Sequence, residues 1–162
     1  MFARPEGAAL LGPGRLPAGS PPRYPASVLS AAADPDVLEA FRGAGRTLFS
    51  LGLVKGSEGN LSTFDGETLW ITRTGCELAA LGPDDVLRGG PMGDFQGASS
   101  DLEVHRARYR ESGPGALAHA HPAGTVPEDG GRPGEHGLYV FAPTLDEAVA
   151  ELVASAREEA AR

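Results

Sequence analysis

The chain has 162 residues and a formal net charge of −8, and this length suits one domain with one hydrophobic core. The acidic balance, with Lys55 as the single lysine, argues against a nucleic-acid partner, because a phosphate backbone is bound by clustered cations. No apolar run approaches the roughly 20 residues that a membrane helix needs. Cys76 is the one cysteine, so no disulfide can form within the chain, and we expect a soluble, cytoplasmic protein.

Residues 1–34 differ in composition from the rest of the chain. They contain six prolines among Gly, Ala and Ser, and their apolar residues follow neither a helical nor a strand period. We interpret this zone as an extended arm, flexible or laid across a neighbour, and not as an independent domain. The folded domain is predicted to cover residues 35–162.

The first predicted helix begins at Asp34-Pro35 and ends near Gly52. Aspartate can cap the free N–H groups of a helix, proline is tolerated at the first helical position, and glycine is a common stop. Five apolar residues recur at helical spacing and are predicted to form its buried stripe: Val37, Leu38, Phe41, Leu48 and Phe49.

A β-hairpin follows, with predicted strands at residues 60–64 and 68–73 around Asp65-Gly66, a pair that tight two-strand turns prefer. The next helix is predicted to start at Ser99-Ser100 and to close at Gly113. In this helix Ser100 and Glu103 have the spacing of a capping box.

The last third of the chain predicts a strand at 116–121, a loop at 122–135 rich in Pro and Gly, and a strand at 137–141. A final helix follows a second capping box formed by Thr144 and Glu147. The whole order therefore predicts an α/β fold, with helices packed on a sheet that has substantial antiparallel pairing.

Three of the four histidines fall in one local pattern. His119 and His121 are two positions apart in a predicted strand, so their side chains leave the same face. His136 lies across the loop, directly before the next strand. Three imidazoles with an open fourth position are typical of a catalytic zinc site. The alternative is that these are scattered surface histidines. For His105, inside the second helix, we favour a packed, hydrogen-bonded structural role.

Small and hydroxylated residues form three pairs at the ends of predicted elements: Gly59-Asn60, Thr74-Gly75 and Ser99-Ser100. Such loops expose N–H groups and hydroxyls that can hold an anion without net positive charge, and the last pair opens a helix. Caps and turns use the same residues, so each pair alone is weak evidence for a phosphate site.

The order of these motifs resembles the class II aldolase/adducin family, and fuculose-phosphate aldolases in particular. The resemblance rests on five blocks in the family's order: Gly-Asn-Leu-Ser at 59–62, Ile-Thr-Arg-Thr-Gly at 71–75, Ser-Ser-Asp at 99–101 with His105 and Tyr109, His-Ala-His-Pro at 119–122, and His-Gly-Leu at 136–138. It implies a three-layer α/β/α fold with a mostly antiparallel sheet. It also implies a homo-oligomer, usually a tetramer, with active sites near subunit interfaces.

The resemblance further implies a role for each site residue. Zinc or another divalent metal would bind His119, His121 and His136. The phosphate of a small sugar phosphate would lie against Gly59, Asn60, Thr74, Gly75, Ser99 and Ser100. Asp101 takes the place of the family's acid/base carboxylate, which is commonly Glu in the aldolases. In the related ribulose-phosphate epimerases the residue is Asp and joins the metal ligands. The implied reaction cleaves or forms a C–C bond through a metal-stabilised enediolate.

The chain departs from the family's pattern between His121 and His136, where a loop replaces a helix and one or more strands. The nearest candidate for the family's catalytic tyrosine is Tyr139, for which core packing is the favoured role. Three functions therefore remain: an active aldolase, a sugar-phosphate 4-epimerase or dehydratase on the same scaffold, and a non-catalytic, adducin-like oligomerisation module.

Overall fold

The computed structural model describes residues 33–126, 132, 134 and 136–162 of the chain. Apart from Ala33 and Asp34, the predicted arm lies outside the described residues. So do parts of the predicted 122–135 loop. The statements below concern the described residues.

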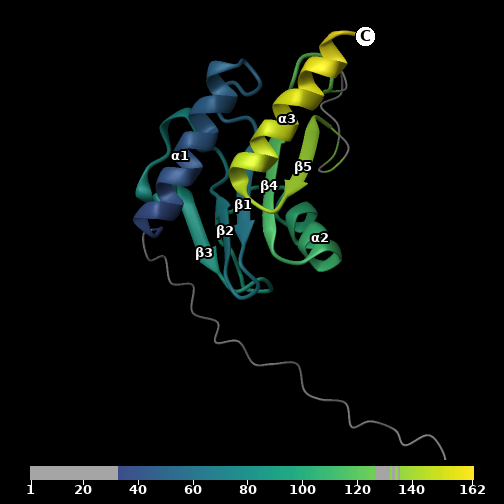
Figure 1. The fold of residues 1–162 in the computed structure, drawn as a ribbon. Coiled ribbons are helices and arrows are strands. Elements are labelled where there is room, and N and C mark those ends of the chain that lie inside the picture. The colour runs from purple at the N-terminus through teal and green to yellow at the C-terminus, as the bar shows by residue number, and fades with distance from the viewer. Residues whose placement is uncertain (1–32, 127–131, 133, 135) are drawn as a thin grey trace, which may run out of the picture.

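A five-stranded sheet forms the middle of the fold (Figure 1). Its order is β3-β2-β1-β4-β5, and every neighbouring pair is antiparallel. The strands are β1 Asn60–Phe64, β2 Leu69–Thr72, β3 Val86–Gly89, β4 Gly115–Ala120 and β5 Leu138–Ala142. Four of these strands were predicted, and the prediction of substantial antiparallel pairing is confirmed.

The β1–β2 hairpin turns where Asp65-Gly66 predicted it. The Asp65 carboxylate accepts hydrogen bonds from the N–H groups of Glu67 and Thr68, at 2.8 and 2.7 Å. Gly66 has a φ of +107°, which few other residues adopt. By contrast, the sequence analysis missed β3, which has only four residues and is too short to display an alternating pattern.

Helices cover both faces of the sheet. Helices α1 (Pro35–Ser50) and α3 (Leu145–Ala160) contact each other and pack on one face. Helix α2 (Leu102–Ser112) lies on the other (Figure 1). Along β4, Ala116 and Ala118 belong to the core under α1 and α3, while Leu117 belongs to the core under α2. The three-layer α/β/α architecture is therefore confirmed.

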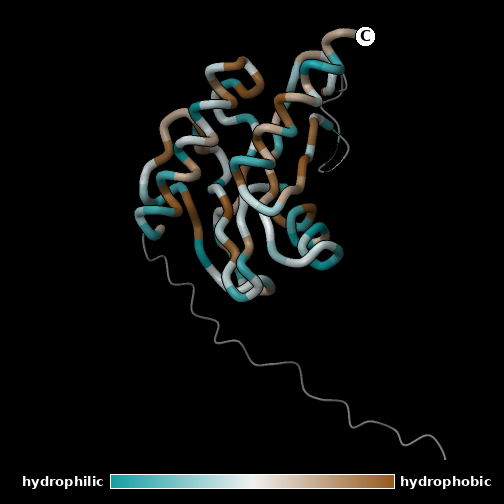
Figure 2. The backbone as a smooth tube through the Cα atoms, viewed as in Figure 1, coloured by the Kyte–Doolittle hydropathy of each residue, from teal (hydrophilic) through white to brown (hydrophobic). Residues whose placement is uncertain are grey.

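Along α1, apolar and polar residues alternate as expected of a helix with one buried face (Figure 2). Phe41 and Leu48 are fully buried, but Phe49 is 52% exposed, so its predicted burial was wrong. Phe49 lies eight positions after Phe41, which places it about 80° further around the helix. No helix in the described part of the chain is both long and apolar enough to cross a bilayer.

The two predicted capping boxes had different outcomes. Thr144 and Glu147 form theirs at the start of α3. The Ser100–Glu103 box was wrong, because α2 begins one residue later than predicted and has Asp101 at its N-cap position. The Asp101 side chain makes no capping bond there. It is engaged instead in the cavity described below.

Candidate metal and substrate site

One polar cavity of about 200 Å³ gathers every site residue that the sequence analysis named. These ten residues are Gly59, Asn60, Thr74, Gly75, Ser99, Ser100, Asp101, His119, His121 and His136. Three further residues, to which no role had been assigned, also line it: Ser57, Glu58 and Arg73. Residues up to 77 positions apart in sequence, from Gly59 to His136, thus meet in one place.

Strand register explains the centre of this cavity. Asn60 of β1 lies directly opposite His119 of β4, and His119 lies directly opposite Tyr139 of β5. Directly opposed residues project from the same face of a sheet, so these three side chains form a row across three strands. His121 follows the end of β4, where its N–H donates to the carbonyl of Leu53 at 2.9 Å.

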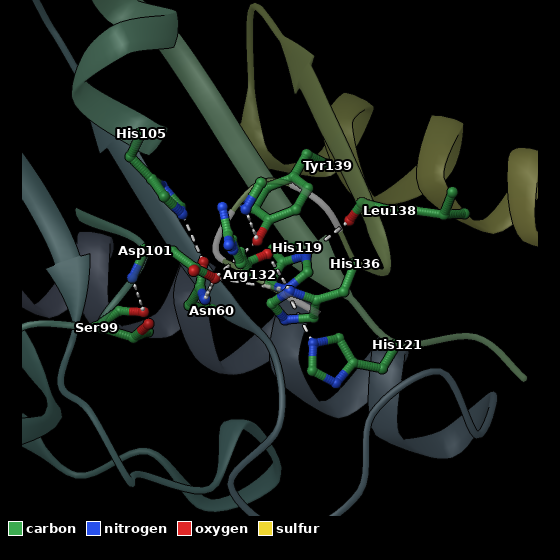
Figure 3. Close-up of polar contacts among 12 residues, drawn as sticks. Asn60, Ser99, Asp101, His105, His119, His121, Arg132, His136, Leu138 and Tyr139 are labelled. Carbon is green, nitrogen blue, oxygen red and sulfur yellow. Dashed lines mark hydrogen bonds and ion pairs between the residues drawn. The ribbon is translucent and has the colours of Figure 1, made fainter. Parts of the chain in front are cut away.

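The three imidazoles converge through their Nε2 atoms (Figure 3). Nδ1 of His119 lies 3.0 Å from the carbonyl oxygen of Leu138, and Nδ1 of His136 lies 2.7 Å from that of Arg132. A carbonyl only accepts, so both Nδ1 atoms carry the proton and both Nε2 atoms present a lone pair. The Nε2 atoms of His119 and His121 are 2.9 Å apart, and one ligand atom from each of the three rings lies within 4.8 Å of the others.

The short connection between His121 and His136 does not separate the rings. Their centroids are 4.8 Å apart, and those of His119 and His136 are 5.1 Å apart. Gly137 makes this approach possible, because its N–H donates to the carbonyl of Thr125 at 2.8 Å and its φ is +67°. A Cβ at Gly137 would lie 2.8 Å from the ring of His119 and 2.9 Å from that of His121.

Burial keeps the rings in the form that binds metals. It lowers the pKa of His119 to about 4. Burial, followed by the neighbouring His136, also lowers the pKa of His121. Neutral imidazoles are the metal-binding form, and an N–H donated to a carbonyl is the usual orienting contact of a ligating histidine. Since His119 is neutral near pH 7, the 3.5 Å approach of its Nε2 to Asp101 Oδ2 is not an ion pair.

Asp101 lies beside the imidazoles and is only 3% exposed. Its Oδ2 accepts hydrogen bonds from Asn60 Nδ2 at 2.7 Å and from the Tyr139 hydroxyl at 3.1 Å. Its Oδ1 is buried and has no hydrogen-bond partner among the described residues. A buried carboxylate oxygen without a partner is costly. The donor set of three imidazoles and this oxygen therefore fits a divalent metal with an adjacent ligand.

Two residues near Asp101 have roles that the sequence partly indicated. His105 is fully buried and hydrogen-bonded, which confirms the structural role favoured for it. Tyr139 packs at the edge of the core, as expected, and also reaches the site. Its ring stacks on that of His119, with centroids 3.7 Å apart and planes at 8°. The sequence signal was its position three residues after His136.

The wall opposite the histidines is made of loop residues. Thr74, Gly75 and Ser100 are exposed, and Gly75 has a φ of +74°. The N–H groups of Gly75 and Ser100 donate to no acceptor among the described residues, whereas that of Thr74 donates to the carbonyl of Gly97 at 2.8 Å. Arg73 is the single cationic side chain on the described lining, and its Nε donates to the carbonyl of Asp84 at 2.9 Å. This wall offers hydrogen-bond donors to an anion.

Comparison with known proteins gives consistent matches. Residues 39–127 match the family described as the Class II Aldolase and Adducin N-terminal domain. The chain is 38% identical over 95 residues to 5-methylthioribulose-1-phosphate/5-deoxyribulose-1-phosphate aldolase of Rhodospirillum rubrum, which covers 56% of this chain and 43% of that protein. The chain spans less than half the length of the curated relatives that it matches.

Solved structures agree with this match. The structure of L-fuculose-1-phosphate aldolase from Thermus thermophilus is similar with a TM-score of 0.50 and 40% identity, over 54% of this chain and 45% of that one. YgbL from Escherichia coli is similar with a TM-score of 0.62 and 20% identity, over 75% of this chain and 86% of that one. At that identity, the likeness to YgbL concerns the fold alone.

Proposed function

Because the chain belongs to the class II aldolase and adducin family, we propose that it is a zinc-dependent aldolase acting on a small sugar phosphate. The observation that carries the proposal is the cavity itself. Three converging imidazoles, a buried carboxylate with an unpaired oxygen and a wall of donors for an anion share a space of about 200 Å³. Such a space suits a substrate smaller than the ligands of typical 300–1,000 Å³ pockets.

In this proposal His119, His121 and His136 hold zinc or another divalent metal, which members of the family generally use. Bound there, the metal supplies Lewis-acid stabilisation of negative charge that develops on a substrate oxygen. The protein's contribution is the orientation of the ligands. The carbonyls of Leu138 and Arg132 hold two rings with their Nε2 lone pairs inward.

The phosphate of the substrate would lie on the opposite wall. The N–H groups of Gly75 and Ser100 are free to donate, and the hydroxyls of Thr74 and Ser100 are exposed beside them. Arg73 adds a positive charge to this wall. Asn60 remains a predicted phosphate contact, but both ends of its side-chain amide already bond to Asp101 and His105. We therefore assign the main phosphate contacts to the loop residues.

Asp101 would move the proton. Its Oδ2 is held by two donors, so Oδ1 is the atom that can take a proton from, or return it to, the carbon or hydroxyl being changed. Aspartate is one methylene shorter than the glutamate common in the aldolases. Burial of Asp101 beside His119 offsets this shorter reach, because it places the carboxylate next to the metal ligands.

A 4-epimerase on the same scaffold is the second candidate, and one observation favours it. Asp101 Oδ2 lies 3.5 Å from His119 Nε2, close enough for the carboxylate to join the three imidazoles as a metal ligand. Aspartate at this position resembles the epimerases in that respect. The two candidates differ in their products, because an epimerase inverts a hydroxyl-bearing carbon and leaves the carbon chain whole.

The test is a retro-aldol assay on the full chain loaded with zinc. A ketose 1-phosphate of the kind named for the similar enzymes, L-fuculose 1-phosphate or 5-deoxyribulose 1-phosphate, is supplied, and release of dihydroxyacetone phosphate is followed by a coupled NADH assay. The Asp101→Asn variant is the control, since it keeps the shape but lowers the basicity of the group. Cleavage that this variant loses supports the aldolase. A zinc-loaded protein that only interconverts ketose phosphates supports the epimerase, and one that turns over neither favours the adducin-like module.

We also propose that the chain acts as a homo-oligomer, a tetramer by resemblance to the family, in the cytoplasm. The thiol chemistry is compatible with this location, because burial raises the pKa of the single cysteine, Cys76, to about 11 and makes it unreactive. Light scattering coupled to size-exclusion chromatography measures the oligomer. A monomer at micromolar concentration would refute the tetramer.

A further inference from the structure

A buried row of polar side chains connects helix α2 to the carboxylate of Asp101. The Tyr109 hydroxyl lies 2.6 Å from Ser62 Oγ, which lies 2.5 Å from His105 Nδ1. His105 Nε2 lies 2.5 Å from Asn60 Oδ1, and Asn60 Nδ2 lies 2.7 Å from Asp101 Oδ2. All five residues are at most 6% exposed, so water does not compete for these hydrogen bonds. Figure 3 shows the last two of these links.

The direction of every hydrogen bond in this row follows from chemistry. Asn60 donates from Nδ2 to Asp101, so its Oδ1 faces His105 and can only accept. Burial lowers the pKa of His105 to about 3, so the ring is neutral and carries its one proton on Nε2.

Nδ1 of His105 must then accept a hydrogen bond, and the Ser62 hydroxyl donates it. Because that uses the only proton of Ser62, the Tyr109 hydroxyl must donate to Ser62. Each donor in the row therefore points toward Asp101.

This polarity has a consequence for Asn60. A side-chain amide can rotate by half a turn and exchange its N–H₂ and oxygen at little cost in shape. The N–H of His105 accepts only one of the two orientations, the one in which Asn60 presents its donor to Asp101. The opposite orientation would place the amide oxygen against the carboxylate and the N–H₂ group against an N–H. His105 thus selects the state of Asn60 that holds Asp101.

Tyr139 completes the arrangement from the other side. Its hydroxyl donates to the same Oδ2 at 3.1 Å, while the N–H of Gly134 donates to that hydroxyl at 3.0 Å. Oδ2 therefore receives two donors, and Oδ1 receives none among the described residues. Hydrogen bonds in a buried row polarise and strengthen one another, which makes such an arrangement rigid.

We propose that His105 is a positioning residue that, through Asn60, fixes Asp101 so that Oδ1 is the oxygen presented to the substrate. The effect on turnover rests on the proposed function, whereas the direction of the row does not. Catalysis depends on geometry at this level, because a displacement of about 1 Å in a reacting group can cost on the order of 100-fold in rate. His105 itself does not line the cavity, so it touches neither substrate nor metal.

The first test is independent of metal and activity. Long-range ¹H–¹⁵N NMR of the metal-free full chain at pH 7 distinguishes the two neutral tautomers of a histidine. We expect His105 to be neutral with its proton on Nε2. A ring with the proton on Nδ1, or a doubly protonated ring, would overturn the proposed direction of the row, whatever reaction the protein performs.

The second test compares two substitutions of similar size. In His105→Gln, the amide can still donate to Asn60 and accept from Ser62, so the row keeps its direction. In His105→Leu, both contacts are lost. With zinc bound, we expect kcat within about threefold of wild type for the Gln variant and a loss of at least tenfold for the Leu variant. KM and zinc content should stay unchanged in both, because the cavity wall is intact.

Equal loss in the two variants, or full activity of His105→Leu, would contradict the proposal. If the Leu variant does not fold, Ser62→Ala replaces it, because it removes the donor to Nδ1 and creates a much smaller cavity. We expect the same fall in kcat at unchanged KM, and wild-type kcat in Ser62→Ala would equally overturn the proposal. If the wild type itself has no turnover, the proposed function fails and the tautomer measurement alone decides whether the row has the stated direction.

Discussion

The neutral state of His105 predicts a specific loss of stability in mild acid. Its pKa is lowered from 6.5 to about 3 because the ring is fully buried. In the unfolded chain the same ring takes up a proton below pH 6.5, whereas in the folded chain it does not until about pH 3. The unfolded state therefore binds more protons between these values, so the free energy of unfolding is highest above pH 6.5 and falls as the pH is lowered.

The magnitude follows from the shift. Each pH unit between the two pKa values changes the free energy of unfolding by about 1.4 kcal/mol. Lowering the pH from 7.5 to 5.0 crosses about 1.5 units of this window and should cost about 2 kcal/mol through His105 alone. His119 and His121 also have lowered pKa values and add to the total loss. A comparison with a variant that lacks only the titration of His105 removes their contribution.

His105→Gln is that variant, because glutamine keeps one donor and one acceptor and does not titrate. Urea denaturation of the metal-free wild type and variant is measured at pH 7.5 and at pH 5.0. The wild type should lose about 2 kcal/mol more than the variant over this range. A difference below about 0.5 kcal/mol, which is the usual limit of additivity, would mean that the folded protein accommodates a charged His105. The assigned direction of the row would then be wrong.

Two further predictions concern the core and the metal ligands. Phe41→Ala should lower the free energy of unfolding by about 3–5 kcal/mol, because Phe41 is fully buried. Phe49→Ala should change it by less than about 0.5 kcal/mol, and equal urea midpoints for the two variants would contradict the packing. Gly137→Ala should weaken zinc binding at least tenfold in a chelator competition titration, because its Cβ would meet the rings of His119 and His121. Gly43→Ala is the control, since no atom lies within 4 Å of its added Cβ, and unchanged zinc affinity in both variants would refute this steric argument.

Elements with a local chemical signal could be predicted from the sequence. Asp34-Pro35 marks the start of α1, where the Asp34 carboxylate accepts from the N–H of Asp36, and Asp65-Gly66 marks the β1–β2 turn. Strand β3 carries no such signal, because it follows a short turn and depends on pairing with β2. The capping box at Ser100 had the right spacing, but the Asp101 side chain bonds to Asn60 instead of capping the helix.

The candidate site shows the same division. His119 and His121 could be paired from strand alternation alone, and the return of His136 was expected from its place before β5. The row through Tyr109, Ser62 and His105 could not be predicted, because it depends on the register of β1 against β4 and on how α2 packs across them. Cross-strand register and helix rotation are tertiary properties, and neither has a short-range signal in the sequence.

The central claim is that His119, His121 and His136 form one metal site in spite of the short connection between the second and third ligand. Elemental analysis of the purified full chain, beside the His119→Ala/His121→Ala double variant, tests it most directly. We predict about one zinc per chain in the wild type and none above background in the variant. Absence of bound metal in the wild type after zinc is supplied, or equal zinc in both proteins, would contradict the account.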